Sequence, residues 1–147
     1  MPTTAPSLLL VPTPRSITIG SGVVPLGPGW NPSNIERRPL AKAKGPEHYE
    51  LTISPAGIVI SHSSPEAERA ALATLAQLRR QFGSSLPEVT IEDWPAFAVR
   101  GVMLDVSRDR IPRMDEFPRI LDTLAGLKFN HLQLYTEHTF AYPGHEA

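Results

Sequence analysis

Apolar and polar residues alternate in the middle of the chain as they do in strands with one packed face. Two runs, 48–54 and 57–62, carry this period of two. The alternating apolar residues are Tyr49, Leu51, Ile53, Ile58 and Ile60. Between the runs, Pro55 fixes φ and Gly57 can take a positive φ. The pattern predicts a β-hairpin with one face on a core.

A helical period follows the hairpin. Ser64 is expected as the N-cap, Pro65 at the first helical position and Gly83 as the C-terminal cap. The apolar stripe comprises Ala71, Leu75, Leu78 and Phe82. Further β-type runs lie at 8–11, 16–19, 22–26 and 88–92, and 27–46 is expected as an irregular connection with room for one more short strand. Residues 8–93 are therefore predicted to form a small α+β domain, a mostly antiparallel sheet with a helix packed on one face.

The pattern changes after Trp94. Residues 99–106 form an almost continuous apolar run, as expected of a strand buried on both faces. Residues 115–127 have helical spacing with Asp115 as the expected N-cap, and 131–135 read as a second strand. Strand, helix and strand in this order predict a βαβ unit with parallel strands and a right-handed crossover.

Composition narrows the class of protein. Fourteen Lys and Arg against fifteen Asp and Glu give a net charge of −1 over 147 residues, which argues against nucleic-acid or polybasic membrane partners. The longest aliphatic run, 8–11, is far short of a membrane span. The absence of Cys excludes disulfides and thiol chemistry. Residues 1–7 are expected as a disordered tail without a signal peptide, so the cytoplasm is the expected compartment, with secreted and periplasmic locations left open.

Polar side chains follow both strands of the predicted βαβ unit. Asp105, Arg108 and Asp109 come at the end of the first strand, and Glu137 and His138 come after the second. The carboxyl ends of parallel strands meet at one edge of a sheet, where ligands bind in α/β folds. We therefore predict a ligand site at this edge.

The same region resembles family 20 glycoside hydrolases, the β-N-acetylhexosaminidases. Residues 91–108, IEDWPAFAVRGVMLDVSR, follow the family pattern D-x-P-x-F-x-x-R-G-x-x-x-D-x-S-R, and KFNHLQL at 128–134 matches the next strand in spacing. In that family the pattern leads from a small α/β domain into a (β/α)8 barrel. The resemblance implies that 8–93 is the family's N-terminal domain and that 94–147 is the start of a TIM barrel, truncated after its first βαβ unit.

The resemblance also implies a substrate site. Arg108 stands where the family's arginine grips sugar hydroxyls, and a guanidinium suits this role because its fixed fork of donors can hold adjacent hydroxyls. Glu137 is the nearest match, shifted by one residue, to a carboxylate that orders this arginine. Asp105 and Asp109 are expected to support the site without touching the sugar, although Asp109 replaces the family's usual His. The alternative for Arg108 is a salt bridge with Asp105 or Asp109 alone.

Several other side chains have plainer interpretations. Trp94 and Phe97 are expected at a domain interface, and Tyr135 and Tyr142 in loop packing rather than in a sugar site. A metal site could be read from a set of regularly spaced histidines and nearby acids. That set is His131, His138, His145, Glu137 and Glu146. It is not expected to bind metal, because the spacing does not place the histidines on one face of an element. No cofactor is expected.

The function implied is removal of terminal β-linked N-acetylhexosamine by substrate-assisted, retaining hydrolysis. The family's catalytic Asp-Glu pair follows the fourth barrel strand, beyond Ala147, so the chain alone is expected to be inactive and to self-associate through its unpaired barrel edge. The expected partner of the whole protein is an N-acetylhexosamine-terminated glycan, with GlcNAc or GalNAc left open. The alternatives are a non-catalytic support, assembly or carbohydrate-binding module, and an O-GlcNAcase-like or chitinase-like hydrolase.

Overall fold

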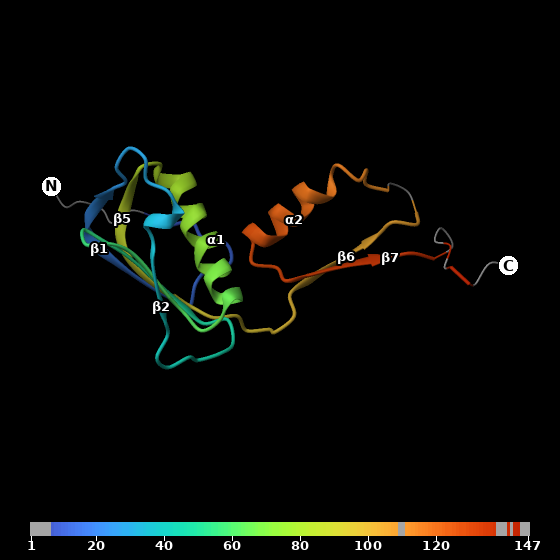
Figure 1. Ribbon diagram of the computed structural model, residues 1–147, viewed down its shortest axis with the longest axis horizontal. Coiled ribbons are helices and arrows are strands. Elements are labelled where there is room, and N and C mark those ends of the chain that lie inside the picture. Colours follow the sequence, from blue (N-terminus) through green and yellow to red (C-terminus); the bar gives the residue numbers. More distant parts are fainter. Residues whose placement is uncertain (1–6, 109–110, 138–140, 142, 145–147) are drawn as a thin grey trace. The chain divides into compact units, whose positions relative to one another are not determined.

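The computed structural model describes residues 7–108, 111–137, 141 and 143–144 (Figure 1). The chain divides into two compact units, Met1–Ala96 and Phe97–Ala147. The boundary between them lies three residues after the predicted one, which is between residues 93 and 94. Residues 1–6 of the predicted tail lie outside the described residues. Neither helix in the described part of the chain combines the length and apolar character that crossing a membrane requires.

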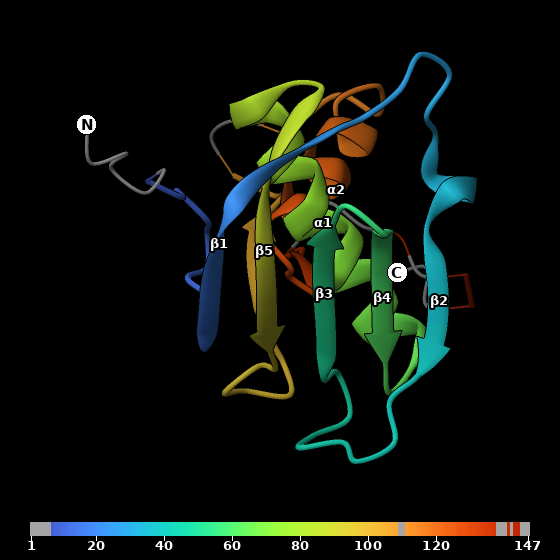
Figure 2. The same cartoon turned by 90° about the vertical axis from the view of Figure 1, so that its left-hand side faces the viewer.

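The first unit is a five-stranded sheet with one long helix. Its strands are β1 (Ser16–Pro25), β2 (Glu36–Pro39), β3 (Tyr49–Ser54), β4 (Gly57–His62) and β5 (Ser85–Asp93). They lie in the order β1-β5-β3-β4-β2, antiparallel except for the parallel pair β2 and β4 (Figure 2). Helix α1 (Pro65–Phe82) packs against one face of the sheet, and a 3-10 turn, η1 (Pro32–Asn34), precedes β2. The predicted α+β domain is confirmed, with a mixed sheet.

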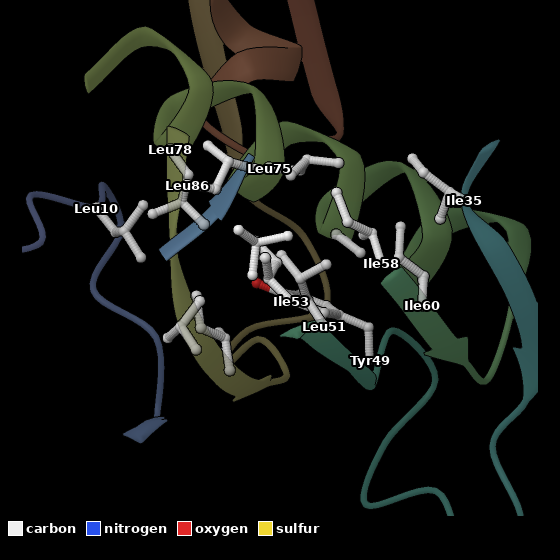
Figure 3. Packing of buried hydrophobic residues seen from close by; sticks show 14 of the residues in the cluster. Leu10, Ile35, Tyr49, Leu51, Ile53, Ile58, Ile60, Leu75, Leu78 and Leu86 are labelled. Carbon is white, nitrogen blue, oxygen red and sulfur yellow. The ribbon is translucent and has the colours of Figure 1, made fainter. Parts of the chain in front are cut away.

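The core lies between α1 and the sheet (Figure 3). The alternating residues of the hairpin point into it and are at most 4% exposed, as are the buried residues of the helix stripe and of β5. These residues are Tyr49, Leu51, Ile53, Ile58, Ile60, Ala67, Ala71, Leu75, Leu78, Leu86, Val89 and Ile91. Ser54 pairs with Gly57 across the turn, and Gly57 has φ 128°. The predicted hairpin is confirmed, both in its position and in the side chains that it directs into the core.

The ends of α1 follow the local sequence. The Ser64 side chain accepts a hydrogen bond from the Ala67 N–H at 3.2 Å, and Pro65 opens the helix. At the other end Gly83 has φ 64° and donates its N–H to the Arg79 carbonyl at 2.9 Å. A residue with a side chain is strained at this φ, so glycine ends the helix.

The prediction of a strand at 8–11 is wrong, because this segment pairs with side chains of α1. Gln81 Oε1 accepts the Leu9 N–H at 2.9 Å, and its Nε2 donates to the Leu9 carbonyl at 2.6 Å. Gln77 does the same for Val11, at 2.9 and 2.7 Å. Alternate peptide groups of an extended chain and side chains four apart on a helix both repeat at about 6 Å, so the two spacings match. We call Gln77 and Gln81, with their bonds to Val11 and Leu9, the glutamine clamp.

The predicted strands 16–19 and 22–26 are one strand, β1, with an irregular pairing between Ile19 and Val23. The Glu88 side chain of β5 occupies this break, and its Oε2 accepts the Gly22 N–H at 3.1 Å. A Cβ at Gly20 would lie 2.7 Å from the Glu88 side chain. The glycines therefore bend β1 around a glutamate without ending it.

The second unit is a strand, a helix and a parallel strand: β6 (Gly101–Asp105), α2 (Phe117–Gly126) and β7 (His131–Tyr135). The order matches the predicted βαβ unit, while its continuation into a barrel stays a prediction. Asp115 is not the N-cap. It pairs with Arg113 at 2.7 Å, and Glu116 precedes the helix without a side-chain cap.

The prediction that the strand at 99–106 is buried on both faces is also wrong, since side chains of this segment are exposed in the described part of the chain. Met103 of β6 is 61% exposed, and Val99, just before the strand, is 69% exposed. The reason is that β6 has one strand neighbour, β7, within the described part of this unit.

Candidate functional site

The carboxyl end of β6 is organised around the Asp105 carboxylate. Its Oδ1 accepts the Ser107 N–H at 2.8 Å and the Ser107 hydroxyl at 2.6 Å, which closes a short turn directly after the strand. These two hydrogen bonds, and the guanidinium of Arg108, lower the pKa of Asp105 to about 2. The carboxylate is therefore ionised at any physiological pH.

Arg108 lies between carboxylates from both strand ends. Its Nε donates to Asp105 Oδ2 at 3.1 Å, and its Nη2 lies 3.4 Å from Glu137 Oε1. The predicted salt bridge with Asp105 and the predicted proximity of Glu137 thus occur together. The Arg108 side chain is 59% exposed, so its remaining N–H groups face solvent.

Tyr135 completes this group of side chains. It pairs with Asp105 in the β6–β7 ladder, and its hydroxyl donates to Glu137 Oε1 at 3.0 Å. The hydrogen bond to Glu137, together with the negative charge of that carboxylate, raises the pKa of Tyr135, because both favour the protonated phenol. We call Asp105, Ser107, Arg108, Tyr135 and Glu137 the strand-end cluster.

Two members of the strand-end cluster, Tyr135 and Ser107, are not among the predicted site residues. The sequence predicts loop packing for Tyr135 and does not identify Ser107. The D-x-S spacing signals the Ser107 turn, since an Asp oxygen commonly accepts the N–H two residues later. Tyr135 gives no such signal in the sequence, because only the strand register brings it opposite Asp105.

The electrostatics of the strand-end cluster disfavour an anionic ligand. One guanidinium and two carboxylates carry a net charge of −1, which disfavours phosphate and other anions. The guanidinium is held on two sides and keeps outward-facing donors, which suits adjacent hydroxyl groups.

Asp109, which is predicted to support the site, lies outside the described residues. The same holds for four residues without a predicted site role, His138, Tyr142, His145 and Glu146. His131 begins β7, at the opposite end of the strand from Tyr135.

Trp94 belongs to the first unit, where the Arg15 guanidinium and the Lys44 ammonium lie 4.6 and 4.8 Å from its ring centroid. Phe97 belongs to the second unit. A role for these two aromatic side chains at a domain interface stays a prediction.

A second group of polar side chains, His48, Glu50 and Glu92, has potential ligand atoms within 4.8 Å of one another. The Lys44 N–H donates to His48 Nδ1 at 3.0 Å, so the proton of the neutral ring lies on Nε2, which faces Glu92 Oε1 at 2.9 Å. A protonated Nε2 cannot ligate a metal. The Lys44 ammonium, 2.5 Å from Glu92 Oε1, already neutralises that carboxylate. This group is therefore an ion pair of Lys44 and Glu92 to which the buried His48 is hydrogen-bonded, rather than a metal site.

Comparison with known proteins connects both units to one family. Residues 30–94 match the model of glycosyl hydrolase family 20, domain 2. A β-hexosaminidase of Akkermansia muciniphila is 37% identical over 90 residues, 59% of this chain and 18% of the relative. The β-hexosaminidase subunit beta of Entamoeba histolytica is 33% identical over 122 residues, 78% of this chain and 21% of the relative.

A solved structure agrees with these relatives. It is described as a glycoside hydrolase family 20 β-N-acetylglucosaminidase, is 28% identical, and superposes with a TM-score of 0.72 over 88% of this chain and 31% of that one. The chain spans about a fifth of the length of the two curated relatives.

Proposed function

We propose that this chain, whose residues 30–94 match the model of glycosyl hydrolase family 20, domain 2, is the N-terminal part of an enzyme that removes terminal β-linked N-acetylhexosamine from glycans. The observation that carries the proposal is the strand-end cluster, in which Arg108 lies between Asp105 and Glu137 at the ends of adjacent parallel strands. This is the edge at which a parallel α/β fold binds its ligand.

In the proposed site Arg108 binds two adjacent hydroxyls of the terminal sugar. Asp105 accepts from the Arg108 Nε and, since its other oxygen is held by Ser107, fixes the guanidinium relative to the strand. Glu137 is held by Tyr135 and limits rotation of the guanidinium from the other side. A guanidinium held in this way loses little conformational freedom when the sugar binds, which favours affinity.

Bond cleavage in this proposal is substrate-assisted. The oxygen of the 2-acetamido group attacks C1, a glutamic acid protonates the leaving oxygen, and an aspartate orients the acetamido group. The adjacent acids Asp115 and Glu116 directly precede α2, where Asp115 pairs with Arg113 and Glu116 with Arg119, so they are not part of the strand-end cluster. We propose that the catalytic Asp-Glu pair follows a later barrel strand, so the 147 residues alone bind sugar weakly and do not hydrolyse it.

Two other functions are the alternatives to this proposal. A carbohydrate-binding or assembly module fits the compact first unit, which folds around its own core. An O-GlcNAcase-like or chitinase-like hydrolase would use the same acetamido chemistry on a different glycan.

The test compares the 147 residues with the protein translated from the complete gene, using an aryl N-acetyl-β-glucosaminide. We expect hydrolysis by the longer protein only. In that protein Arg108→Lys should lower kcat/KM roughly 100-fold, since a lysine cannot hold two hydroxyls and two carboxylates. Arg119→Lys on α2 is the matched control, because Arg119 contacts Glu116 and lies outside the strand-end cluster.

The alternatives predict different results in the same experiment. No turnover by either protein would favour the binding or assembly module. Faster turnover of chitin oligomers or of O-GlcNAc peptides than of terminal β-linked N-acetylhexosamine would favour the other hydrolases.

A further inference from the structure

We propose that Arg100 and Asn130 are positioning residues, which set the register of β6 against β7 and thereby hold Arg108 and Glu137 opposite each other. Both residues directly precede their strands, at the end remote from the strand-end cluster. The ladder runs over four residue steps from Gly101↔His131 to Asp105↔Tyr135, about 13 Å. The inference rests on the proposed sugar site and adds the device that aligns it.

The Asn130 side chain binds the backbone of the other strand as a peptide group would. Its Oδ1 accepts the Arg100 N–H at 2.9 Å, and its Nδ2 donates to the Ala98 carbonyl at 2.7 Å. The backbone N–H groups of Asn130 and His131 donate to the Arg100 carbonyl at 3.0 and 3.2 Å. A shift of one residue would break these bonds together.

Arg100 makes the reciprocal connection. Its Nε donates to the Lys128 carbonyl at 2.9 Å, and its Nη1 donates to the Phe97 carbonyl at 2.8 Å. Lys128 has φ 63° and directs the chain from the end of α2 toward β7. The guanidinium therefore ties the chain before β6 to the turn that leads into β7.

The first ladder pair is closely packed. A Cβ at Gly101 would lie 3.0 Å from His131 Cδ2 and 3.1 Å from His131 Cβ, so a larger residue opposite this histidine would require His131 to shift by a few tenths of an ångström. A slip of one residue would also turn Asp105 or Tyr135 to the opposite face of the sheet, because side chains alternate along a strand. The strand-end cluster exists only in the register that Arg100 and Asn130 hold.

The test uses the protein from the complete gene with Asn130→Asp, which keeps the shape and loses the donor to Ala98, and Arg100→Lys. We expect each to lower kcat/KM on the aryl N-acetyl-β-glucosaminide roughly 10- to 100-fold. In an Arg108→Lys background the same changes should cost no more than about twofold, because the alignment that they disturb has already lost its function. Arg119→Lys is the control.

A second measurement reads the register directly. The Val106 N–H donates to the Tyr135 carbonyl at 2.9 Å, at the site end of the ladder. Its hydrogen exchange should become about tenfold faster in Asn130→Asp and stay unchanged in Arg119→Lys.

Equal losses of kcat/KM in both backgrounds, or an unchanged kcat/KM beside faster exchange, would overturn the proposal. If the wild-type protein hydrolyses nothing, the proposed function fails, while unchanged exchange at Val106 would separately refute the role of Arg100 and Asn130.

Discussion

The glutamine clamp is expected to stabilise the first unit, and its contribution to the free energy of unfolding can be measured. Gln77 is 9% exposed and makes two hydrogen bonds to Val11, each contributing about 1 kcal/mol net. Gln77→Ala should therefore lower the free energy of unfolding by about 2 kcal/mol. Gln81→Ala should lower it by about 1 kcal/mol, because water can replace its exposed bonds to Leu9.

Gln77→Glu separates the donor from the acceptor. Glutamate keeps the oxygen that accepts the Val11 N–H but places a second oxygen against the Val11 carbonyl, so the folded state favours the protonated acid and raises its pKa. Stability relative to wild type should then be highest below the ordinary glutamate pKa of about 4.3, and should fall as pH rises through the raised folded value.

Urea unfolding followed by tryptophan fluorescence measures this unit, since both tryptophans, Trp30 and Trp94, lie in it. Arg80→Ala, at an exposed position of the same helix, is the control. Losses below about 0.5 kcal/mol for both Gln77→Ala and Gln81→Ala would refute the clamp as a stabilising contact. A Gln77→Glu variant without pH dependence would refute the assignment of donor and acceptor.

Three further predictions concern the second unit. Ser107→Ala should raise the pKa of Asp105 from about 2 toward its ordinary value, so that the Asp105–Arg108 contact is lost at a higher pH than in the wild type, where it persists until pH falls through about 2. An NMR titration of the Asp105 carboxyl carbon in the complete-gene protein measures this, and an unchanged titration midpoint would contradict it. Gly101→Ala should lower the thermal midpoint of that protein by several degrees through contact with His131, whereas Gly126→Ala, with open space around it, should not. The 147-residue chain should sediment as an associating species, and a concentration-independent monomer would contradict this.

Local signals account for what the sequence predicted best in the fold. The hairpin turn and both ends of α1 are set by residues adjacent to them, namely Gly57, Ser64 and Gly83. The failures at 8–11 and at Asp115 have a distant and a local cause, respectively. The segment 8–11 has the composition of a strand, but its partners are two side chains from a helix more than 60 residues later. Asp115 is a good capping residue in composition, yet Arg113, two residues away, binds its carboxylate.

The candidate site divides in the same way. Asp105, Arg108 and Glu137 were found because strand ends and a family pattern point to them. Tyr135 and Asn130 were missed as site and positioning residues, because their contacts depend on the register of strands about 30 residues apart. Periodicity gives the faces of a strand, whereas register comes from pairing, which one strand alone does not encode.

The distribution of buried apolar side chains explains why the two units differ in what they can do alone. Among the described residues, every buried hydrophobic side chain lies at or before Ile91, so the first unit has a core of its own. In the second unit Met103, Met114 and Leu134 are 61%, 81% and 49% exposed. The strand-end cluster is nevertheless formed, because its contacts are local turns and one ladder. The proposed sugar-binding geometry at this edge therefore depends on register and turns, while the stability of the strands that carry it requires further apolar surface to cover them.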